Sequence, residues 1–213
     1  MVDKIVDNLR ADEIIRTAIV TGRLQPNQRL VEVELTRTFG VGRSAVRTAL
    51  ARLEQEGLVE HQRHRGARVR LVEEREAVEI LETRAVLEGL TARHAALSAT
   101  NDDVDRLRGI LARMRQLLDE GDLLAASDEN VVLHQRVSDI AGHATAARLI
   151  ATLKSQLVRF QYRTILLPGR SERSFAEHAA IVDAVARGDP NAAETVMRTH
   201  LEHVADALRS SRP

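Results

Sequence analysis

The stretch GVGRSAVRTALARLEQEGLV, from Gly40 to Val59, decides the fold of the first part of the chain. It opens with two glycines around a turn, continues with helical spacing, and stops at a further glycine. The apolar positions of this segment share one helical face, and they are Val46, Ala49, Leu50 and Leu53. We therefore predict a helix over residues 44–56. Arg43 and Arg47 lie one turn apart at its start, away from the apolar face.

The segments on both sides of this helix complete a small domain. Residues 4–21 have apolar positions near helical spacing, and residues 32–39 form a short predicted helix that ends at a glycine. Beyond the long helix, residues 58–70 contain two short segments around a basic tip with a glycine, which is typical of a β-hairpin. Three helices and a hairpin describe a winged helix-turn-helix, to which we assign residues 1–71.

The composition and pattern of the sequence change from residue 72 onward. Strand signals vanish, and alanine, leucine, arginine and glutamate dominate. We predict helices over residues 73–98, 102–119, 122–141, 144–166, 172–187 and 190–209. Because the breaks between them are short, neighbouring helices should run antiparallel in a bundle. The predicted fold class is mainly α, with the winged helix-turn-helix followed by an all-helical bundle over residues 72–213.

Charge is distributed unevenly along a chain whose formal net charge is zero. Residues 23–70 contain ten arginines and five glutamates, a local charge of +5. The first 22 residues carry −1, so the remainder from residue 71 carries −4. A basic module is thus joined to a mildly acidic one, which favours a polyanionic partner for the first module alone.

Composition excludes several other classes of protein. The chain has no cysteine, which excludes disulfides and thiolate metal sites and suits a reducing cytoplasm. No charged-then-apolar leader opens it, and no apolar run approaches the roughly 18 residues of a membrane span. Aromatic residues are only 2%, which argues against a surface on which bases stack. We expect a cytoplasmic protein with no membrane partner.

Arg43 and Arg47 are candidates for reading DNA. The second helix of a helix-turn-helix lies in the major groove, and its first residues reach base edges. Arginine offers two donors that match O6 and N7 of guanine. A solvated helix face is the alternative interpretation of these arginines. The short preceding helix, the glycine turn and the arginine-rich hairpin favour the groove.

These residues also carry a family resemblance. The segment Leu35–Val59 resembles the DNA-reading segment of GntR-family bacterial repressors, and Arg65–Val69 resembles their wing. The helical remainder resembles the FCD ligand-binding domain of the FadR-type subgroup. The resemblance implies a ligand-responsive transcriptional regulator rather than an enzyme, and a repressor is the expected kind. It also implies a homodimer on double-stranded operator DNA and a small organic acid as effector.

The resemblance implies a set of DNA contacts. They are Arg43, Ser44, Arg47, His64, Arg65 and Gly66. The two helix arginines would meet bases or nearby phosphates, and Ser44 would meet a phosphate. At the wing tip, Gly66 would let the backbone approach the minor groove, with His64 or Arg65 beside it. Gly42 stands where the family usually has Ser or Thr, so it offers only its backbone N–H.

Histidines in the helical part are candidates for a metal site. Asn130 and His134 are four residues apart and share a helix face, while His178 and His200 lie on apolar faces of two later helices. Buried imidazoles are costly unless something uses their lone pairs, and a divalent metal does. Spacing alone is a weak indication of a metal site, because no sequence rule shows that three distant helices converge; ordinary buried histidines are the alternative. FCD domains bind a metal through such a pattern, so the resemblance implies Asn130, His134, His178 and His200 as ligands of Zn²⁺ or Ni²⁺.

Arg84 matches an arginine that this subgroup often points into its pocket, where it could bind an effector carboxylate. An ion pair with Glu88, one turn later, is the alternative. Two other functions stay open. A metal-dependent hydrolase could use the three histidines with Glu177 as its base. A constitutive DNA binder could carry a purely structural metal.

Overall fold

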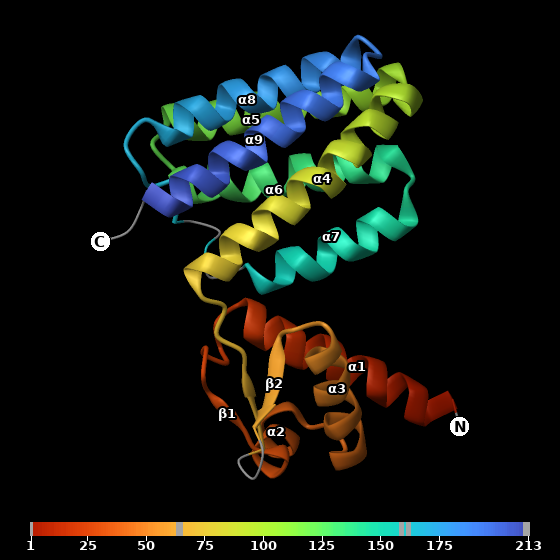
Figure 1. Ribbon diagram of the computed structural model, residues 1–213. Coiled ribbons are helices and arrows are strands. Elements are labelled where there is room, and N and C mark those ends of the chain that lie inside the picture. Colours follow the sequence, from red (N-terminus) through yellow and green to blue (C-terminus); the bar gives the residue numbers. More distant parts are fainter. Residues whose placement is uncertain (1, 63–65, 158–159, 161–162, 211–213) are drawn as a thin grey trace. The chain divides into compact units, whose positions relative to one another are not determined.

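The computed structural model describes residues 2–62, 66–157, 160 and 163–210 (Figure 1). The chain divides into two compact units, Met1–Val72 and Glu73–Pro213. The division lies one residue beyond the boundary expected from the sequence. The predicted fold class is confirmed, because a winged helix-turn-helix precedes an all-helical unit.

The first unit contains three helices and a small sheet. Its elements are α1 (Val2–Val20), β1 (Arg29–Leu30), α2 (Glu32–Phe39), α3 (Arg43–Gln55), β2 (Val59–Gln62) and β3 (Gly66–Val69). The strands are antiparallel in the order β1-β3-β2, with Ala67 opposite Leu30 on one side and His61 on the other. The sequence did not predict β1, because two residues are too few to show the alternation that marks a strand.

The turn between α2 and α3 sets the direction of α3. Gly40 ends α2 with a φ of 65°, a left-handed conformation that glycine adopts without strain. The buried residues Leu35, Val46 and Leu53 then pack with Ile15 of α1 in one hydrophobic core. Since this core fixes the apolar face of α3, the opposite face of that helix is left to solvent.

The second unit is a bundle of six helices in the described part of the chain. They are α4 (Glu74–Ser98), α5 (Asn101–Asp119), α6 (Leu123–Ala141), α7 (Ala144–Gln156), α8 (Arg170–Ala186) and α9 (Pro190–Ser210). Helix α4 packs against α9, α6, α7 and α8, and α5 packs against α6 and α8 (Figure 1). No helix in the described ranges is both long and apolar enough to cross a membrane.

The helix predicted over residues 144–166 is shorter than expected. It ends at Gln156, where the N–H of Leu157 donates to the carbonyl of Lys154 at 3.0 Å in a tighter turn. The sequence has no glycine or proline before Pro168 to signal this end. The prediction therefore extended the helix too far.

The interior of the helical unit is not uniformly apolar. Among the described residues, every buried polar or charged side chain lies in this unit: Glu88, Thr91, Ser127, His134, Ser138, Arg170, His178 and His200. Buried charges are rare in protein cores unless they are paired or bind a ligand. The polar interior marks this unit as the place to look for a ligand site.

Candidate metal centre and DNA-reading surface

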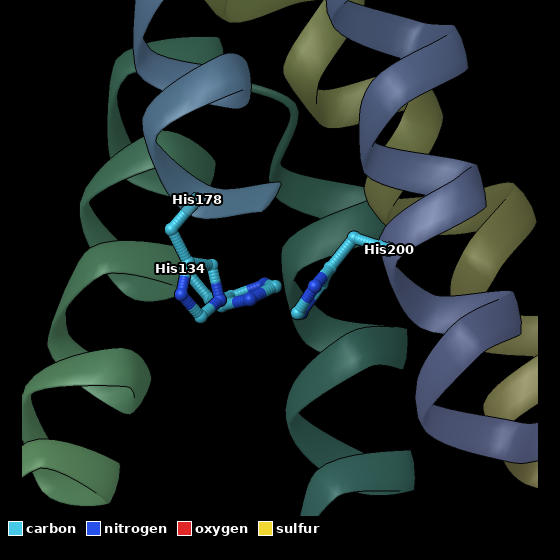
Figure 2. A group of neighbouring side chains, drawn as sticks. All are labelled: His134, His178 and His200. Carbon is cyan, nitrogen blue, oxygen red and sulfur yellow. The ribbon is translucent and has the colours of Figure 1, made fainter. Parts of the chain in front are cut away.

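Three helices bring the three predicted histidines together. His134 comes from α6, His178 from α8 and His200 from α9, and their rings point toward one another (Figure 2). One ring nitrogen from each lies within 4.8 Å of the others. The ring centroids of His178 and His200 are 4.4 Å apart, and those of His134 and His200 are 5.2 Å apart. Three nitrogens at this spacing can surround one metal ion.

Burial keeps these imidazoles neutral. The exposed fractions of His134, His178 and His200 are 5%, 1% and 2%. Burial lowers the pKa of His134 to about 4, although the neighbouring Glu88 opposes the shift. Burial, and then the repulsion that a charged His178 would meet from charged His200 and His134, holds the pKa of His178 well below its usual value. Neutral imidazole is the form that binds metals, so the cluster is ready for one at neutral pH.

Two carboxylates orient two of the three rings. Nδ1 of His134 donates to Oε2 of Glu88 at 2.6 Å, and Nδ1 of His200 donates to Oε2 of Glu177 at 2.7 Å. Since an ionised carboxylate can only accept, the proton of each ring lies on Nδ1. The lone pair of each ring is therefore on Nε2. Carboxylate–histidine pairs of this kind fix the tautomer and raise the basicity of metal-binding imidazoles.

Both carboxylates are ionised. Burial by itself would raise the pKa of Glu88, but the charges of Arg84 and then Lys154, with the hydrogen bond from His134, hold it well below the usual value. Burial likewise opposes ionisation of Glu177, and the hydrogen bond from His200, with the charge of Arg170, lowers its pKa to about 2. Each carboxylate thus keeps its acceptor role across the physiological pH range.

Unpartnered buried polar atoms lie on His178 and on two residues connected to the cluster by a contact or by helix spacing. Among the described residues, eight buried side-chain nitrogen and oxygen atoms have no hydrogen-bond partner. Five of the eight belong to Asn130, Arg170 and His178: Oδ1 of Asn130, Nε and Nη1 of Arg170, and both ring nitrogens of His178. Asn130 lies one turn before His134 on α6, and Arg170 donates to Glu177 at 3.0 Å.

Arg84 is paired with Glu88, as in the alternative weighed from the sequence. Its Nε donates to Oε1 of Glu88 at 2.8 Å, and its Nη2 lies 2.7 Å from the same oxygen. Because Glu88 also holds His134, this pair connects Arg84 to the histidine cluster. Contact between Arg84 and an effector stays a prediction.

The other candidate surface lies at the start of α3. Arg43, Ser44 and Arg47 are exposed there, while Val46 on the same helix is buried. Gly42 precedes the helix as its N-cap without a side-chain hydrogen bond. Gly66 begins β3 with a φ of 80° and open space where a Cβ would be. His64 and Arg65 lie outside the described residues.

Comparison with known proteins establishes the family. Residues 8–69 match the family described as bacterial regulatory proteins, gntR family, and residues 79–203 match the FCD domain. The chain belongs to the GntR family and carries an FCD domain. The resemblance stated from the sequence is thereby confirmed, and the protein is a transcriptional regulator of this family.

Named relatives of this GntR regulator have the same architecture over nearly their whole length. The transcriptional regulator LutR of Bacillus subtilis is 30% identical over 211 residues, covering 89% of this chain and 95% of the relative. The transcriptional repressor RspR of Escherichia coli is 26% identical over 205 residues, covering 96% of this chain and 90% of the relative. The solved structure of McbR/YncC from E. coli superposes with a TM-score of 0.77 at 18% identity, covering 96% and 97% of the two chains, and supports the fold.

The matched families and relatives are regulators rather than enzymes, which confirms the expectation of no catalytic activity. The geometry of Glu177, the residue considered as a catalytic base, agrees with this conclusion. Glu177 accepts from His200, His203 and Arg170, so its oxygens are already engaged. A carboxylate with a pKa of about 2 is also a weak base at neutral pH.

Sequence reasoning missed the carboxylates and the buried cations around the cluster. Glu88 was considered only as a partner of Arg84, and Glu177 only as a catalytic base. Arg170 and Glu177 are seven residues apart on α8, which places them on one helix face, but spacing does not show that this face meets His200. Such contacts depend on which helices converge, and no local signal carries that information.

Proposed function

We propose that this GntR regulator binds a divalent metal through Asn130, His134, His178 and His200, and leaves its operator when a small organic acid binds beside that metal. One observation carries the proposal, namely the five unpartnered buried atoms of His178, Arg170 and Asn130. They include acceptor atoms, which a metal ion would satisfy, and donor atoms, which an anion would satisfy.

The acceptor atoms support a cation. The neutral ring of His178 has a buried lone pair and a buried N–H without partners, and Oδ1 of Asn130 is also unpartnered. A buried acceptor left unpaired costs about 1–3 kcal/mol. A cation that also takes the Nε2 lone pairs of His134 and His200 would remove this cost. The donor set of three imidazoles and one amide oxygen fits Zn²⁺ or Ni²⁺.

The donor atoms support an anion. Arg170 is 7% exposed, and only its Nη2 is engaged, by Glu177. Beside His134, Arg84 and Lys154 share one carboxylate, Glu88, to which the Lys154 ammonium comes within 3.9 Å. The side with Arg84 and Lys154 thus carries one positive charge in excess. A bound metal would add to this charge and supply a Lewis acid for a carboxylate oxygen.

The regulatory part of the proposal follows from linkage. An acid can release DNA only if it binds more tightly to an arrangement of the protein that cannot hold the operator. We further propose that the regulator is a cytoplasmic homodimeric repressor. Each winged domain would then occupy one half-site of a two-fold symmetric operator.

Metal content tests the site directly. We expect about one zinc or nickel ion per chain by elemental analysis of the purified protein, and none in the double variant His134→Ala, His178→Ala. His94→Ala serves as the control, because His94 is a half-buried histidine that packs edge-to-face against His143 instead of joining the cluster. Equal metal content in the double variant and the wild type would refute the proposed ligands.

Release of DNA tests the effector. Fluorescence anisotropy of a labelled operator duplex, titrated with a panel of hydroxy acids and di- and tricarboxylates, should identify an acid that lowers affinity. Arg84→Ala should raise the required acid concentration about tenfold, which corresponds to 1.4 kcal/mol of lost binding. Arg75→Ala, on an exposed position of the same helix, should not. If no acid in the panel releases the duplex, a constitutive binder with a structural metal becomes the better account.

A further inference from the structure

One carboxylate in the winged domain contacts both candidate DNA-reading arginines. Glu32 is the first residue of α2, and its Oε2 accepts from Nε of Arg43 at 3.0 Å. Its Oε1 accepts from Nε of Arg47 at 3.1 Å, and its Oε2 also accepts from Nη2 of Arg47 at 3.1 Å. The carboxylate therefore joins the start of α2 to two successive turns of α3.

The edges used in these contacts leave the arginines able to read a base. A guanidinium has five N–H groups, of which the pair at its far end forms the fork that fits O6 and N7 of guanine. Arg43 uses only its Nε toward Glu32, and among the described residues its two terminal nitrogens have no hydrogen-bond partner. Arg47 uses the side edge made by Nε and Nη2, which leaves Nη1 and the second N–H of Nη2 at the end of the group.

The ion pairs lie at the surface but the carboxylate is partly sheltered. Side chains of Arg43 and Arg47 are 66% and 69% exposed, while that of Glu32 is 27% exposed. Hydrogen bonds from Arg47 and then Arg43 lower the pKa of Glu32 to about 2. Glu32 therefore stays negatively charged under all conditions in which the protein would meet DNA.

Glu34, a neighbouring glutamate on α2, provides a comparison for the contacts of Glu32. Both Glu32 and Glu34 lie in the first turn of α2, where a negative charge stabilises a helix start. In the described part of the chain, however, only Glu32 is hydrogen-bonded to Arg43 and Arg47. Helix stabilisation accounts for an acidic residue at either position, but not for the bridge to α3.

We infer that Glu32 is a positioning residue that aims Arg43 and Arg47 at base edges and thereby sets the sequence specificity of the DNA-binding domain. The inference rests on the proposed role of these arginines in the major groove. Two free arginines can also bind phosphates anywhere on a duplex, because phosphate contacts carry no sequence information. Held by Glu32, they lose that freedom, and the added negative charge weakens contact with the phosphate backbone.

This role has a signature that simple competition lacks. A positioning carboxylate should strengthen specific binding and weaken non-specific binding, so its removal should move the two affinities in opposite directions. A carboxylate that merely occupied the arginines would weaken both kinds of binding, and its removal would strengthen both. The ratio of specific to non-specific affinity therefore separates the two roles.

The experiment begins with selection of preferred duplexes from a random pool by the wild-type protein. Affinities of the wild type, Glu32→Gln, Glu34→Gln and Arg47→Ala are then measured for the selected duplex and for a shuffled duplex. Gln keeps the shape of the side chain but cannot accept from both arginines with both ends. We expect the affinity ratio of Glu32→Gln to fall by about tenfold, within the range set by loss of one bidentate base contact. Glu34→Gln, which removes the same charge, should change it less than twofold.

The outcomes separate this inference from the proposal beneath it. Unchanged base preference in Arg47→Ala would mean that the arginine does not read bases, and the proposed groove role would fail. If Arg47→Ala loses base preference as expected, but Glu32→Gln and Glu34→Gln have equal ratios of specific to non-specific affinity, only the positioning role of Glu32 would be overturned. Equal strengthening of both duplexes by Glu32→Gln would assign Glu32 to competition. A repeated selection with Glu32→Gln should yield a more degenerate site.

Discussion

The candidate DNA-reading surface and the histidine cluster are built in the same way but lie in opposite surroundings. In each, a carboxylate holds nitrogen-bearing side chains in one orientation: Glu32 holds two arginines, and Glu88 and Glu177 hold one histidine each. Glu32 and its arginines are partly or largely exposed, whereas Glu88 and the histidines are buried.

Surroundings decide what such a contact can do. Water screens an exposed ion pair, which contributes only about 0–1 kcal/mol and can exchange its partner for a phosphate. Neither water nor a phosphate can replace a buried carboxylate in this way. The side chains that it holds therefore stay fixed unless another buried group takes its place. The difference suits the two proposed roles, a surface that approaches and leaves DNA and an interior that keeps a binding site in one arrangement.

The largest effect should follow removal of the buried charge of Glu88. Glu88→Gln leaves Arg84 and Lys154 without an anion, and breaking a buried pair costs about 3–5 kcal/mol. The Gln amide would also donate to Nδ1 of His134 and move the ring proton to Nε2, which should weaken metal binding about 10–100-fold. Urea unfolding and metal titration measure the two effects. Glu82→Gln is the control, since Glu82 lies on the same helix as Glu88 and forms an exposed ion pair with Arg209. An equal loss of stability and of metal affinity in both variants would contradict the difference between buried and exposed carboxylates.

Removal of a DNA-reading arginine should leave stability intact and weaken DNA binding. Arg47→Ala is expected to lose about 1–3 kcal/mol of affinity for the preferred duplex and to relax base preference at one position. Arg52→Ala, an exposed arginine near the other end of α3, is the matched control. Fluorescence anisotropy at fixed salt concentration measures the affinity of both variants for the duplex. An equal loss of affinity would mean that Arg47→Ala acts only through the loss of a positive charge.

A smaller effect of opposite sign should appear in the metal-free protein. His178→Leu replaces a ring whose two nitrogens are buried and unpartnered, so the variant should be more stable than the wild type by about 1 kcal/mol. The measurement is urea unfolding after treatment with a chelator. With metal added, the order should reverse, because only the wild type gains binding energy. A loss of stability in the metal-free variant would show that His178 makes a favourable contact without metal.

The smallest effect on stability is expected at the exposed site. Glu32→Gln should change the free energy of unfolding by less than about 0.5 kcal/mol, because exposed ion pairs contribute little. Its effect on DNA specificity should nevertheless be measurable. Thermal unfolding of this variant beside Glu88→Gln compares the two surroundings directly, and a large loss for Glu32→Gln would mean that the bridge between α2 and α3 holds the fold.

Much of the architecture followed from local patterns. The apolar spacing in residues 44–56 predicted α3 to within a residue at each end, and glycine marked the ends of α2 and α6. Local patterns failed where no local signal exists, at the two-residue strand β1 and at the end of α7. The same limit applied to the sites, since Glu32 and Arg47 are fifteen residues apart and Glu88 and His134 are forty-six apart.

By itself, the sequence determined the helices, apart from the end of α7, and the hairpin of β2 and β3. It also determined where the basic module lies and which side chains are chemically suited to DNA or to a metal. Periodicity, capping and side-chain chemistry are properties of neighbouring residues, so they can be read along the chain. Only the tertiary structure decided that the rings of His134, His178 and His200 meet, that Glu88 and Glu177 set their protons, and that Glu32 bridges two arginines. Those contacts depend on how whole helices pack, which is fixed by the core and not by any single segment.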